Sequence, residues 1–475
     1  MINKKRHYPK VNKLFLILCD FFSLCIAIFL AYYLSFPDDF SLSVEEFYDS
    51  VVRLSLFLFS ALGIVGWIWV VYRHYTYRKP YWDELKDIYV TLFIGALINL
   101  ALLVFTKNHF SLYTWCYIWV LAGVLLPLGR MLCKKALREL GTWNMSCALV
   151  CDAQSLKGAF QAITSETYLG YNITAIVLQG EEKESPEQIS GVKYITPPEF
   201  WVQLNQFQKV FIAFDNQHQP LLECWVRKLA KEGLRNVSIL PPLRGVPLYD
   251  AEVSHFFGHE AIALRIHNNL AKRSSRLVKR TFDIVVSSFL LLLTAPLFGY
   301  LVLRIRQDGG AATYSQVRIG RNGKAFHCYK FRTMVTNSAQ VLRQLLHSDP
   351  QARQEWYTHY KLKNDPRVTP IGALLRRTSL DELPQLWNVL KGDMSLVGPR
   401  PVIRPELKFY GDDLIYYYMV RPGLSGLWQV SGRSDTDYPT RVYLDCWYVK
   451  NWALWNDIVI LAKTASVVLK GKGAY

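Results

Sequence analysis

The chain has 475 residues, a hydrophobic content of 51%, an aromatic content of 14% and a formal net charge of +17. Its length predicts about three domains, and apolar runs of membrane-spanning length exclude an ordinary soluble protein. The positive charge suits nucleic acid, anionic lipid or a phosphorylated substrate, and the apolar runs favour lipid and phosphate.

Four apolar stretches come first in the chain, each near the length that a helix needs to cross about 30 Å of hydrocarbon. They lie at about 14–35, 51–72, 88–105 and 112–132, and they predict a four-helix transmembrane domain over residues 1–140. The N-terminal segment is basic and the first loop is acidic. Because cytoplasmic loops are enriched in Lys and Arg, the end of the bundle and the domain that follows are expected on the cytoplasmic face of a bacterial inner membrane.

The next segment alternates short apolar runs with helical patterns. The runs SCALVCD, YNITAIVLQ, KVFIAFD and NVSIL read as strands of a small parallel sheet, which predicts a cytoplasmic Rossmann-like α/β domain over residues 145–250. The turn after the first strand, 151–155, has no glycine fingerprint. We therefore expect a structural or regulatory role for this domain rather than dinucleotide binding. Residues 251–276 are expected to form a linker.

A fifth apolar run, at 281–303, has basic residues on both sides. A spanning helix would place one basic cluster outside, against the usual orientation rule. Pro296 lies within the run and removes a helical hydrogen bond, which favours a kink. A broken helix that enters and leaves on the cytoplasmic face satisfies both observations, and an ordinary fifth span is the alternative.

The polar segment after the fifth run is predicted to form two strands joined at Asn322 and Gly323, a dipeptide suited to a tight hairpin. Basic residues cluster around it and recur downstream, at Arg318, Arg321, Lys324, Lys330, Arg332, Arg376, Arg377, Arg400 and Arg421. Solvated surface bases are the plain interpretation. Their recurrence favours anion binding, because planar guanidinium groups match phosphate.

Two adjacent carboxylates, Asp381 and Glu382, lie in the arginine-rich stretch RRTSLDELPQLWNVLKGDMSLVGPRP at 376–401. Ser379 and Glu382 have the spacing of a helix capping box, with Pro384 near the expected helix start and Gly392 near its end. A structural capping role is therefore one hypothesis. The neighbouring arginines and membrane segment favour the other, which is phosphate chemistry at a bilayer surface.

Several long motifs resemble the bacterial sugar transferase domain of the monotopic phosphoglycosyl transferases. They are KRTFDIVVSS, KFRTM, LRRTSLDELPQLWNVLKGDMSLVGPRP, RPGLSGLWQVSGR and LDCWYVKNWALWNDI, in this order. The resemblance covers roughly residues 277–475 and implies an α+β catalytic domain with a re-entrant membrane helix at 281–303. With its additional N-terminal regions, the chain resembles the large members that start O-antigen, capsule and exopolysaccharide repeat units. Ala295 departs from the serine that often precedes the proline in such proteins.

The resemblance implies transfer of a sugar 1-phosphate from a UDP-sugar to undecaprenyl phosphate. It maps the nucleophile onto Asp381 and support of Mg²⁺ and the reacting phosphate onto Glu382. Lys279 and Arg280 match a motif where bases would meet lipid headgroups or the acceptor phosphate, and Asp283 and Pro296 take structural roles. On this basis we assign phosphate or nucleotide contacts to Arg318, Lys330, Arg332, Arg376, Arg377 and Arg400.

Galactose is the sugar that the overall resemblance favours, although glucose or an N-acetylhexosamine would require no visible change in these motifs. A non-catalytic membrane scaffold is the competing hypothesis, but it leaves the C-terminal motifs without a purpose. A nucleic-acid partner is not expected, because no RNA- or DNA-binding module is visible. A homodimer is compatible with this organisation, and no residue in the sequence demonstrates it.

Overall fold

The computed structural model describes residues 9–35, 44–105, 111–179, 189–234, 236–243, 246, 251–255, 262–265, 269–307, 309–359, 362, 365–431 and 437–470. The chain divides into two compact units, Met1–Leu243 and Arg244–Tyr475. The expected boundary between membrane helices and α/β domain falls inside the first unit, and the expected linker falls inside the second.

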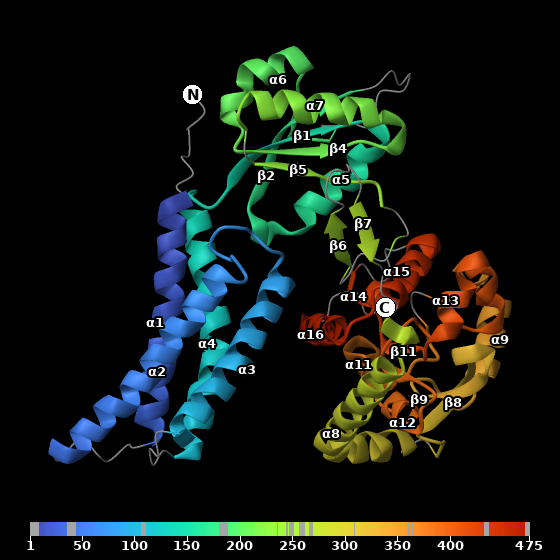
Figure 1. The fold of residues 1–475 in the computed structure, drawn as a ribbon. Helices are drawn as coiled ribbons and strands as arrows, with labels where there is room; N and C mark the ends of the chain where they lie inside the picture. Colours follow the sequence, from blue (N-terminus) through green and yellow to red (C-terminus); the bar gives the residue numbers. More distant parts are fainter. Residues whose placement is uncertain are drawn as a thin grey trace. The chain divides into compact units, whose positions relative to one another are not determined.

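The four N-terminal apolar stretches form helices, as predicted (Figure 1). Their bounds are α1 Pro9–Ser35, α2 Val44–Val70, α3 Tyr81–Phe105 and α4 Leu112–Glu139. Three of them, at Lys10–Ser35, Tyr81–Phe105 and Leu112–Glu139, are long and apolar enough in their described residues to cross a membrane. Ala27, Ile68 and Leu126 are buried between the helices, whereas Phe93 and Val120 face outward. Apolar side chains on both faces are typical of helices in lipid.

A buried polar network lies within this bundle. Arg130 of α4 donates hydrogen bonds to Asp20 of α1 and Glu84 of α3, and Lys134 lies 2.7 Å from Glu84. The Tyr75 hydroxyl also donates to Asp20, over 2.5 Å. Buried charges are stable only when they are paired, so this network fixes the relative positions of three helices.

The loop between α2 and α3 joins the bundle to the α/β domain. Arg78 donates to the carbonyl oxygens of Leu169 and Trp143, each over 2.6 Å, and its guanidinium lies 4.2 Å from the centre of the Trp143 ring. The Lys134 ammonium lies 4.0 Å from the centre of the Tyr168 ring. These contacts explain why the bundle and the sheet form one unit.

The α/β domain contains a five-stranded parallel sheet in the order β3-β2-β1-β4-β5. Its strands are β1 Met145–Cys151, β2 Tyr171–Leu178, β3 Lys193–Tyr194, β4 Lys209–Ala213 and β5 Val237–Ile239. Helices α6 (Pro197–Gln203) and α7 (Gln219–Lys231) cover one face through Phe200 and Trp225, and α5 (Ala153–Ser165) covers the other through Leu156 (Figure 1). The sequence predicted four of these strands and missed β3, because two residues carry no readable pattern.

The second unit begins with an antiparallel pair, β6 Glu252–His255 and β7 Ile262–Arg265. These strands lie in the stretch that we expected to be a linker. Four-residue strands are too short for alternation to separate them from irregular chain.

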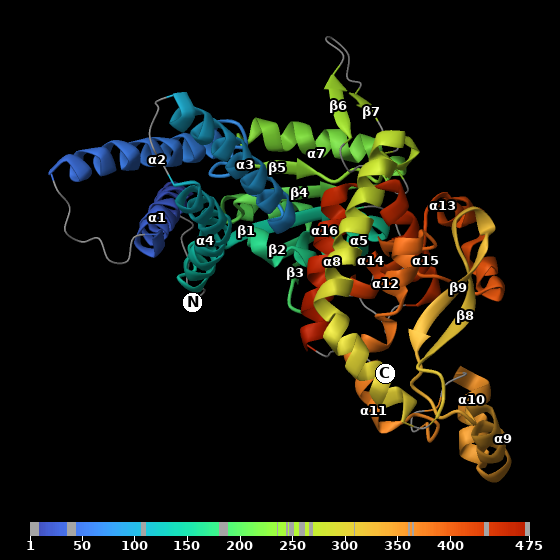
Figure 2. The same ribbon diagram turned by 90° about the horizontal axis from the view of Figure 1, so that it is seen from below.

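Helix α8 runs from Arg273 to Arg306 with Pro296 inside it, and it changes direction along its length (Figures 1 and 2). Its first part packs through Phe282 and Leu290 against one apolar core of this unit. Its last part packs through Leu301 and Ile305 against a second core. The outward side chains include Val285, Phe289 and Leu292, which are 61%, 62% and 77% exposed. Both ends of an apolar helix therefore pack on the same unit, while its middle presents apolar side chains outward.

The predicted hairpin is confirmed. Strands β8 (Thr313–Ile319) and β9 (Ala325–Phe331) pair antiparallel, and Asn322 and Gly323 have φ values of 58° and 71°. Helices α9 (Ser338–Ser348) and α10 (Pro350–His359) follow the hairpin (Figure 2). The remaining elements are α11 Pro370–Thr378, α12 Gln385–Lys391, β10 Ser395–Val397, α13 Leu414–Met419, β11 Gly423–Ser425, α14 Leu427–Ser431, α15 Tyr438–Lys450 and α16 Leu454–Lys470.

Candidate active site

The two adjacent carboxylates lie on a single 3₁₀ turn, Leu380–Glu382, between α11 and α12. Ser379 ends α11 in the left-handed conformation, with φ 56°, and makes no side-chain capping bond. The capping-box hypothesis is therefore wrong, because the Ser379 hydroxyl accepts no capping hydrogen bond from the 3₁₀ turn that it precedes. The predicted ends of α12 hold, since Pro384 precedes it and Gly392 follows it with φ 94°.

Lys330 of β9 contacts both carboxylates. Its ammonium lies 2.6 Å from Oε1 of Glu382 and 3.6 Å from Oδ2 of Asp381. Burial raises the pKa of Asp381, and the positive charge of Lys330 opposes that rise. Burial would lower the pKa of Lys330, but Glu382 and Asp381 outweigh it and raise this pKa. The site thus holds a partly desolvated, basic carboxylate next to a firmly protonated amine.

Helix α11 brings Arg376 to the same site. Its Nε donates to the Thr333 hydroxyl over 3.0 Å, and its charge acts on Asp381. The helix packs so closely on the chain after β9 that a Cβ built on Gly372 would meet the Thr333 carbonyl oxygen at 2.0 Å. Arg377, on the next position, is exposed. The structure therefore places Arg376, but not Arg377, in contact with the framework of the site.

Arg400 belongs to the segment that follows β10, and Arg318 of β8 contacts this segment. The guanidinium of Arg318 donates to the Pro401 carbonyl over 3.2 Å and lies 3.9 Å from Glu406. Arg400 is exposed, with its guanidinium 5.6 Å from the centre of the Trp428 ring. Both arginines, with Lys330 and Glu382, are close enough to influence Cys328 of β9, whose pKa is raised by burial to about 11. The structure thus gathers these four side chains around one strand.

Other expected phosphate contacts have internal partners. Arg332 donates to the carbonyls of Ala311, Met334 and Ile305. The Lys279 ammonium lies 2.7 Å from Asp457 and also donates to the Tyr448 hydroxyl.

Arg280 donates to the carbonyls of Val389 and Leu390 at the end of α12. Asp283 accepts from the Ser395 hydroxyl and the Leu396 amide, each over 3.0 Å. These side chains hold α8, α12 and β10 together.

Asn388 is a positioning residue that the sequence analysis missed. It is fully buried in α12, donates to the His327 carbonyl over 2.7 Å and accepts from the Tyr329 amide over 3.0 Å. These bonds tie the helix after the carboxylates to the strand that carries Lys330. A polar residue inside the apolar run LWNVL was the available signal, because a buried amide requires hydrogen-bonding partners.

Magnesium fits this site only in part. Among the residues that the structure describes, no group of three or more His, Cys, Asp and Glu side chains could hold a metal ion. Mg²⁺ is commonly held by one or two carboxylates together with substrate phosphates and water. The Asp381 and Glu382 carboxylates would be the protein ligands of such a site, and substrate phosphates and water would be the other ligands.

A family model described as bacterial sugar transferase matches residues 274–471. The chain is 47% identical over 475 residues, 99% of each protein, to the undecaprenyl-phosphate galactose phosphotransferase of Salmonella typhimurium. It is 42% identical over 456 residues, 96% of this chain and 95% of the relative, to the UDP-galactose-lipid carrier transferase of Erwinia amylovora. It is 28% identical over 398 residues, 80% of this chain and 81% of the relative, to the UDP-glucose:undecaprenyl-phosphate glucose-1-phosphate transferase of Escherichia coli.

Proposed function

This chain belongs to the bacterial sugar transferase family, and from that premise we propose that it transfers galactose 1-phosphate from UDP-galactose to undecaprenyl phosphate. The products are undecaprenyl-diphosphogalactose and UMP, and the reaction starts the assembly of an O-antigen or related polysaccharide repeat unit. The observation that carries the proposal is the carboxylate pair on a turn with Lys330 in contact with both members.

Asp381 is the nucleophile of a two-step transfer. An Oδ atom of Asp381 attacks the β-phosphorus of UDP-galactose, and the bond from that phosphorus to the bridging oxygen breaks, so that UMP leaves. A phosphate oxygen of undecaprenyl phosphate then attacks the same phosphorus and releases the Asp381 carboxylate. Burial favours this role, because a desolvated carboxylate with a raised pKa is a stronger nucleophile than a solvated one.

The cations of the site offset the repulsion between an anionic nucleophile and an anionic substrate. Lys330 holds Glu382 and faces Asp381, and Arg376 acts on Asp381 from α11. Arg318 of β8 and Arg400 of the segment after β10 offer guanidinium groups to the nucleotide phosphates. Arg377 is an exposed candidate for the same task. When bound by Asp381 and Glu382 together with the substrate phosphates, Mg²⁺ would neutralise charge on the phosphoryl oxygens.

Arg332 supports the site indirectly, because its guanidinium holds backbone carbonyls of the chain around β9. Its role in the proposal is positioning.

The membrane arrangement that suits this reaction is a re-entrant α8 below a cytoplasmic catalytic region. Both parts of α8 pack on cores of the same unit, which is the expected arrangement if the helix returns to the face from which it entered. Pro296 provides the reason for a bend. The basic loops of the N-terminal bundle favour the cytoplasmic face of the bacterial inner membrane for this unit.

The α/β domain is Rossmann-like in our proposal, because its parallel strand order has the first strand in the centre and the third at one edge. We give it a structural or regulatory role. We include a homodimer in the proposal but assign no interface to it. Sedimentation of the purified protein in detergent measures its oligomeric state.

The test is UMP release by the purified full-length protein from a panel of UDP-sugars, with and without undecaprenyl phosphate and magnesium. We expect UDP-galactose to be the preferred donor and Asp381→Asn to lower the rate by roughly a thousand-fold or more, as removal of a nucleophile does in other enzymes. Asp412→Asn, at an exposed position, is the matched control. Wild-type protein without acceptor should release at most one UMP per active site. No UMP from any donor would favour a scaffold instead, and a preference for UDP-glucose would move the assignment to another sugar.

A further inference from the structure

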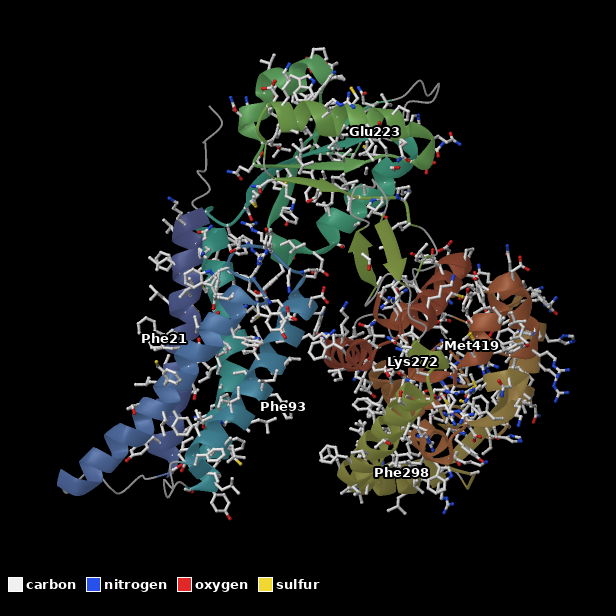
Figure 3. All side chains as sticks on the ribbon, viewed as in Figure 1. Phe21, Phe93, Glu223, Lys272, Phe298 and Met419 are labelled. Carbon is white, nitrogen blue, oxygen red and sulfur yellow. The ribbon has the colours of Figure 1, made fainter. Side chains whose placement is uncertain are left out.

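A pocket lies at the base of α8, away from the carboxylate pair. Its polar lining comprises Arg276, Lys279, Asp283, Arg321, Ser395 and Arg421. Met419, which also lines it, is labelled in Figure 3. Arg421 donates to the carbonyl of Gly392, which follows α12, whereas Asp381 and Glu382 precede that helix. At about 1.5 Å per residue, α12 alone separates the two places by roughly 10 Å.

The basic residues of this pocket differ in how far their charges are compensated. Lys279 is paired with Asp457, and Asp283 already accepts two hydrogen bonds. By contrast, no carboxylate of the described residues lies within ion-pair distance of Arg276 or Arg321. The Nε of Arg321 is also buried without a hydrogen-bond partner among them.

The pocket therefore carries surplus positive charge. Its four basic side chains are offset by two carboxylates, Asp283 and the Lys279 partner Asp457, which leaves an excess of two positive charges. Arg280 and Asp393 also act on Arg421, but their charges are opposite and leave this excess unchanged. The pKa of Arg421 is lowered, first by burial and then by the charges of Arg280 and Arg321. Arg321 and Arg421 are half-buried and Arg276 is exposed, and repulsion between neighbouring, partly desolvated guanidinium groups is relieved when an anion binds among them.

The position of the pocket indicates where such an anion comes from. Arg276 lies in the first turn of α8, and the exposed apolar side chains Val285, Phe289 and Leu292 follow within the next turns. In a helix that enters a bilayer, basic residues just before the apolar run lie at the depth of the lipid headgroups. A phosphate is the headgroup anion that guanidinium groups bind best.

We propose that this pocket binds the phosphate headgroup of a membrane lipid, with Arg276, Arg321 and Arg421 as its contacts. This assignment replaces the expectation that Lys279 and Arg280 contact that phosphate, since both have internal partners. The choice of lipid rests on the proposed function. Undecaprenyl phosphate would be held here before or after it reaches Asp381, and an anionic phospholipid would be held as a permanent anchor.

The test measures lipid binding without turnover. Full-length Asp381→Asn protein in mixed micelles would be titrated with undecaprenyl phosphate, phosphatidylglycerol or inorganic phosphate, and occupancy read by native mass spectrometry. We expect Arg321→Gln and Arg276→Gln each to weaken phospholipid or undecaprenyl phosphate binding about 10-fold, the usual effect of losing one charge-assisted hydrogen bond. Arg273→Gln is the matched control, because Arg273 is exposed on the same helix and does not line the pocket.

The outcomes separate the sources of the phosphate. A loss confined to undecaprenyl phosphate identifies an acceptor site, and a loss for both lipids identifies a general headgroup site; either supports the proposal. Unchanged affinity for both lipids in the two variants overturns it, as does binding of inorganic phosphate in preference to either lipid.

A kinetic measurement adds a second criterion. With Asp381 restored, an acceptor site requires Arg321→Gln to raise the KM for undecaprenyl phosphate and leave the KM for UDP-galactose unchanged. An increase only in the latter would place the nucleotide here and contradict the proposal. If Asp381→Asn retained activity, the nucleophile assignment would fail while the binding result stood.

Discussion

Replacement of Lys330 by Met tests whether this lysine sets the protonation of the nucleophile. In the wild type, burial raises the pKa of Asp381 and Lys330 lowers it. Removing the ammonium takes away the largest effect that opposes burial and leaves Arg376 as the remaining cation that lowers this pKa, so the pKa of Asp381 must rise further. Because the nucleophile acts as a carboxylate, the acidic limb of the pH–rate profile is expected to move to higher pH, and activity at neutral pH to fall.

The size of the shift follows from the geometry. At the observed 3.6 Å between Lys330 Nζ and Asp381 Oδ2, Coulomb's law with an effective dielectric constant near 20 gives about 5 kcal/mol. The two side chains are 25% and 15% exposed, so water screens part of this attraction. A nearby opposite charge typically moves a carboxyl pKa by about 1–3 units, and we expect a shift of the limb in that range.

The assay is kcat/KM for UMP formation as a function of pH, measured for Lys330→Met, Lys330→Arg and Lys324→Met. Lys330→Arg keeps the positive charge, so its limb should stay near that of the wild type even if its rate falls. Lys324, exposed on the same hairpin, is the control. An acidic limb in Lys330→Met that coincides with the wild type would show that Lys330 does not control the pKa of Asp381, whatever happens to the maximal rate.

Two further predictions concern the framework of the site. Asp445 accepts from the Tyr410 hydroxyl over 2.8 Å, and burial raises its pKa to about 7. The protonated Asp445 side chain therefore stabilises the folded protein below about pH 4, and this contribution is lost as the pH rises through 7. Asparagine carries no charge at either pH. Asp445→Asn should therefore raise the free energy of unfolding at pH 8, by up to about 4 kcal/mol, and leave it unchanged at pH 4. Equal melting temperatures of variant and wild type at both pH values would contradict this. Gly372→Ala should lower the free energy of unfolding by about 1–3 kcal/mol and lower activity, because the added Cβ would meet the Thr333 carbonyl oxygen. Gly158→Ala in α5, where a Cβ has open space, is the control. Thermal unfolding should show this control to be neutral or slightly stabilising.

The elements that the sequence predicted correctly are those with local signals. Apolar length identified the four N-terminal helices, and alternation of apolar runs with helical patterns identified the sheet. The Asn322–Gly323 dipeptide identified the hairpin, because positive φ angles at two successive residues restrict the residue types. Each of these signals lies in a short, continuous stretch of sequence and does not depend on distant residues.

The side-chain roles that the sequence did not predict depend on partners far apart in the chain. Arg332 and Arg376 are the same residue type in similar basic surroundings, yet Arg332 donates to backbone carbonyls, whereas Arg376 donates to the Thr333 hydroxyl and its charge lowers the pKa of Asp381. Lys279 is internal because Asp457, 178 positions away, lies beside it. Charge and spacing alone do not distinguish a base that holds the fold together from one that faces a ligand.

The contacts of Arg78 bear on how chains of this kind can exchange segments. Its acceptors are main-chain carbonyls, which any sequence supplies, but its stacking partner Trp143 and the neighbouring Lys134–Tyr168 pair are specific side chains. A chimera that joined the membrane helices of one protein to the sheet of another would need both partners of each pair, Arg78 with Trp143 and Lys134 with Tyr168. We therefore expect functional chimeras to tolerate a crossover after residue 243 more readily than one near residue 140.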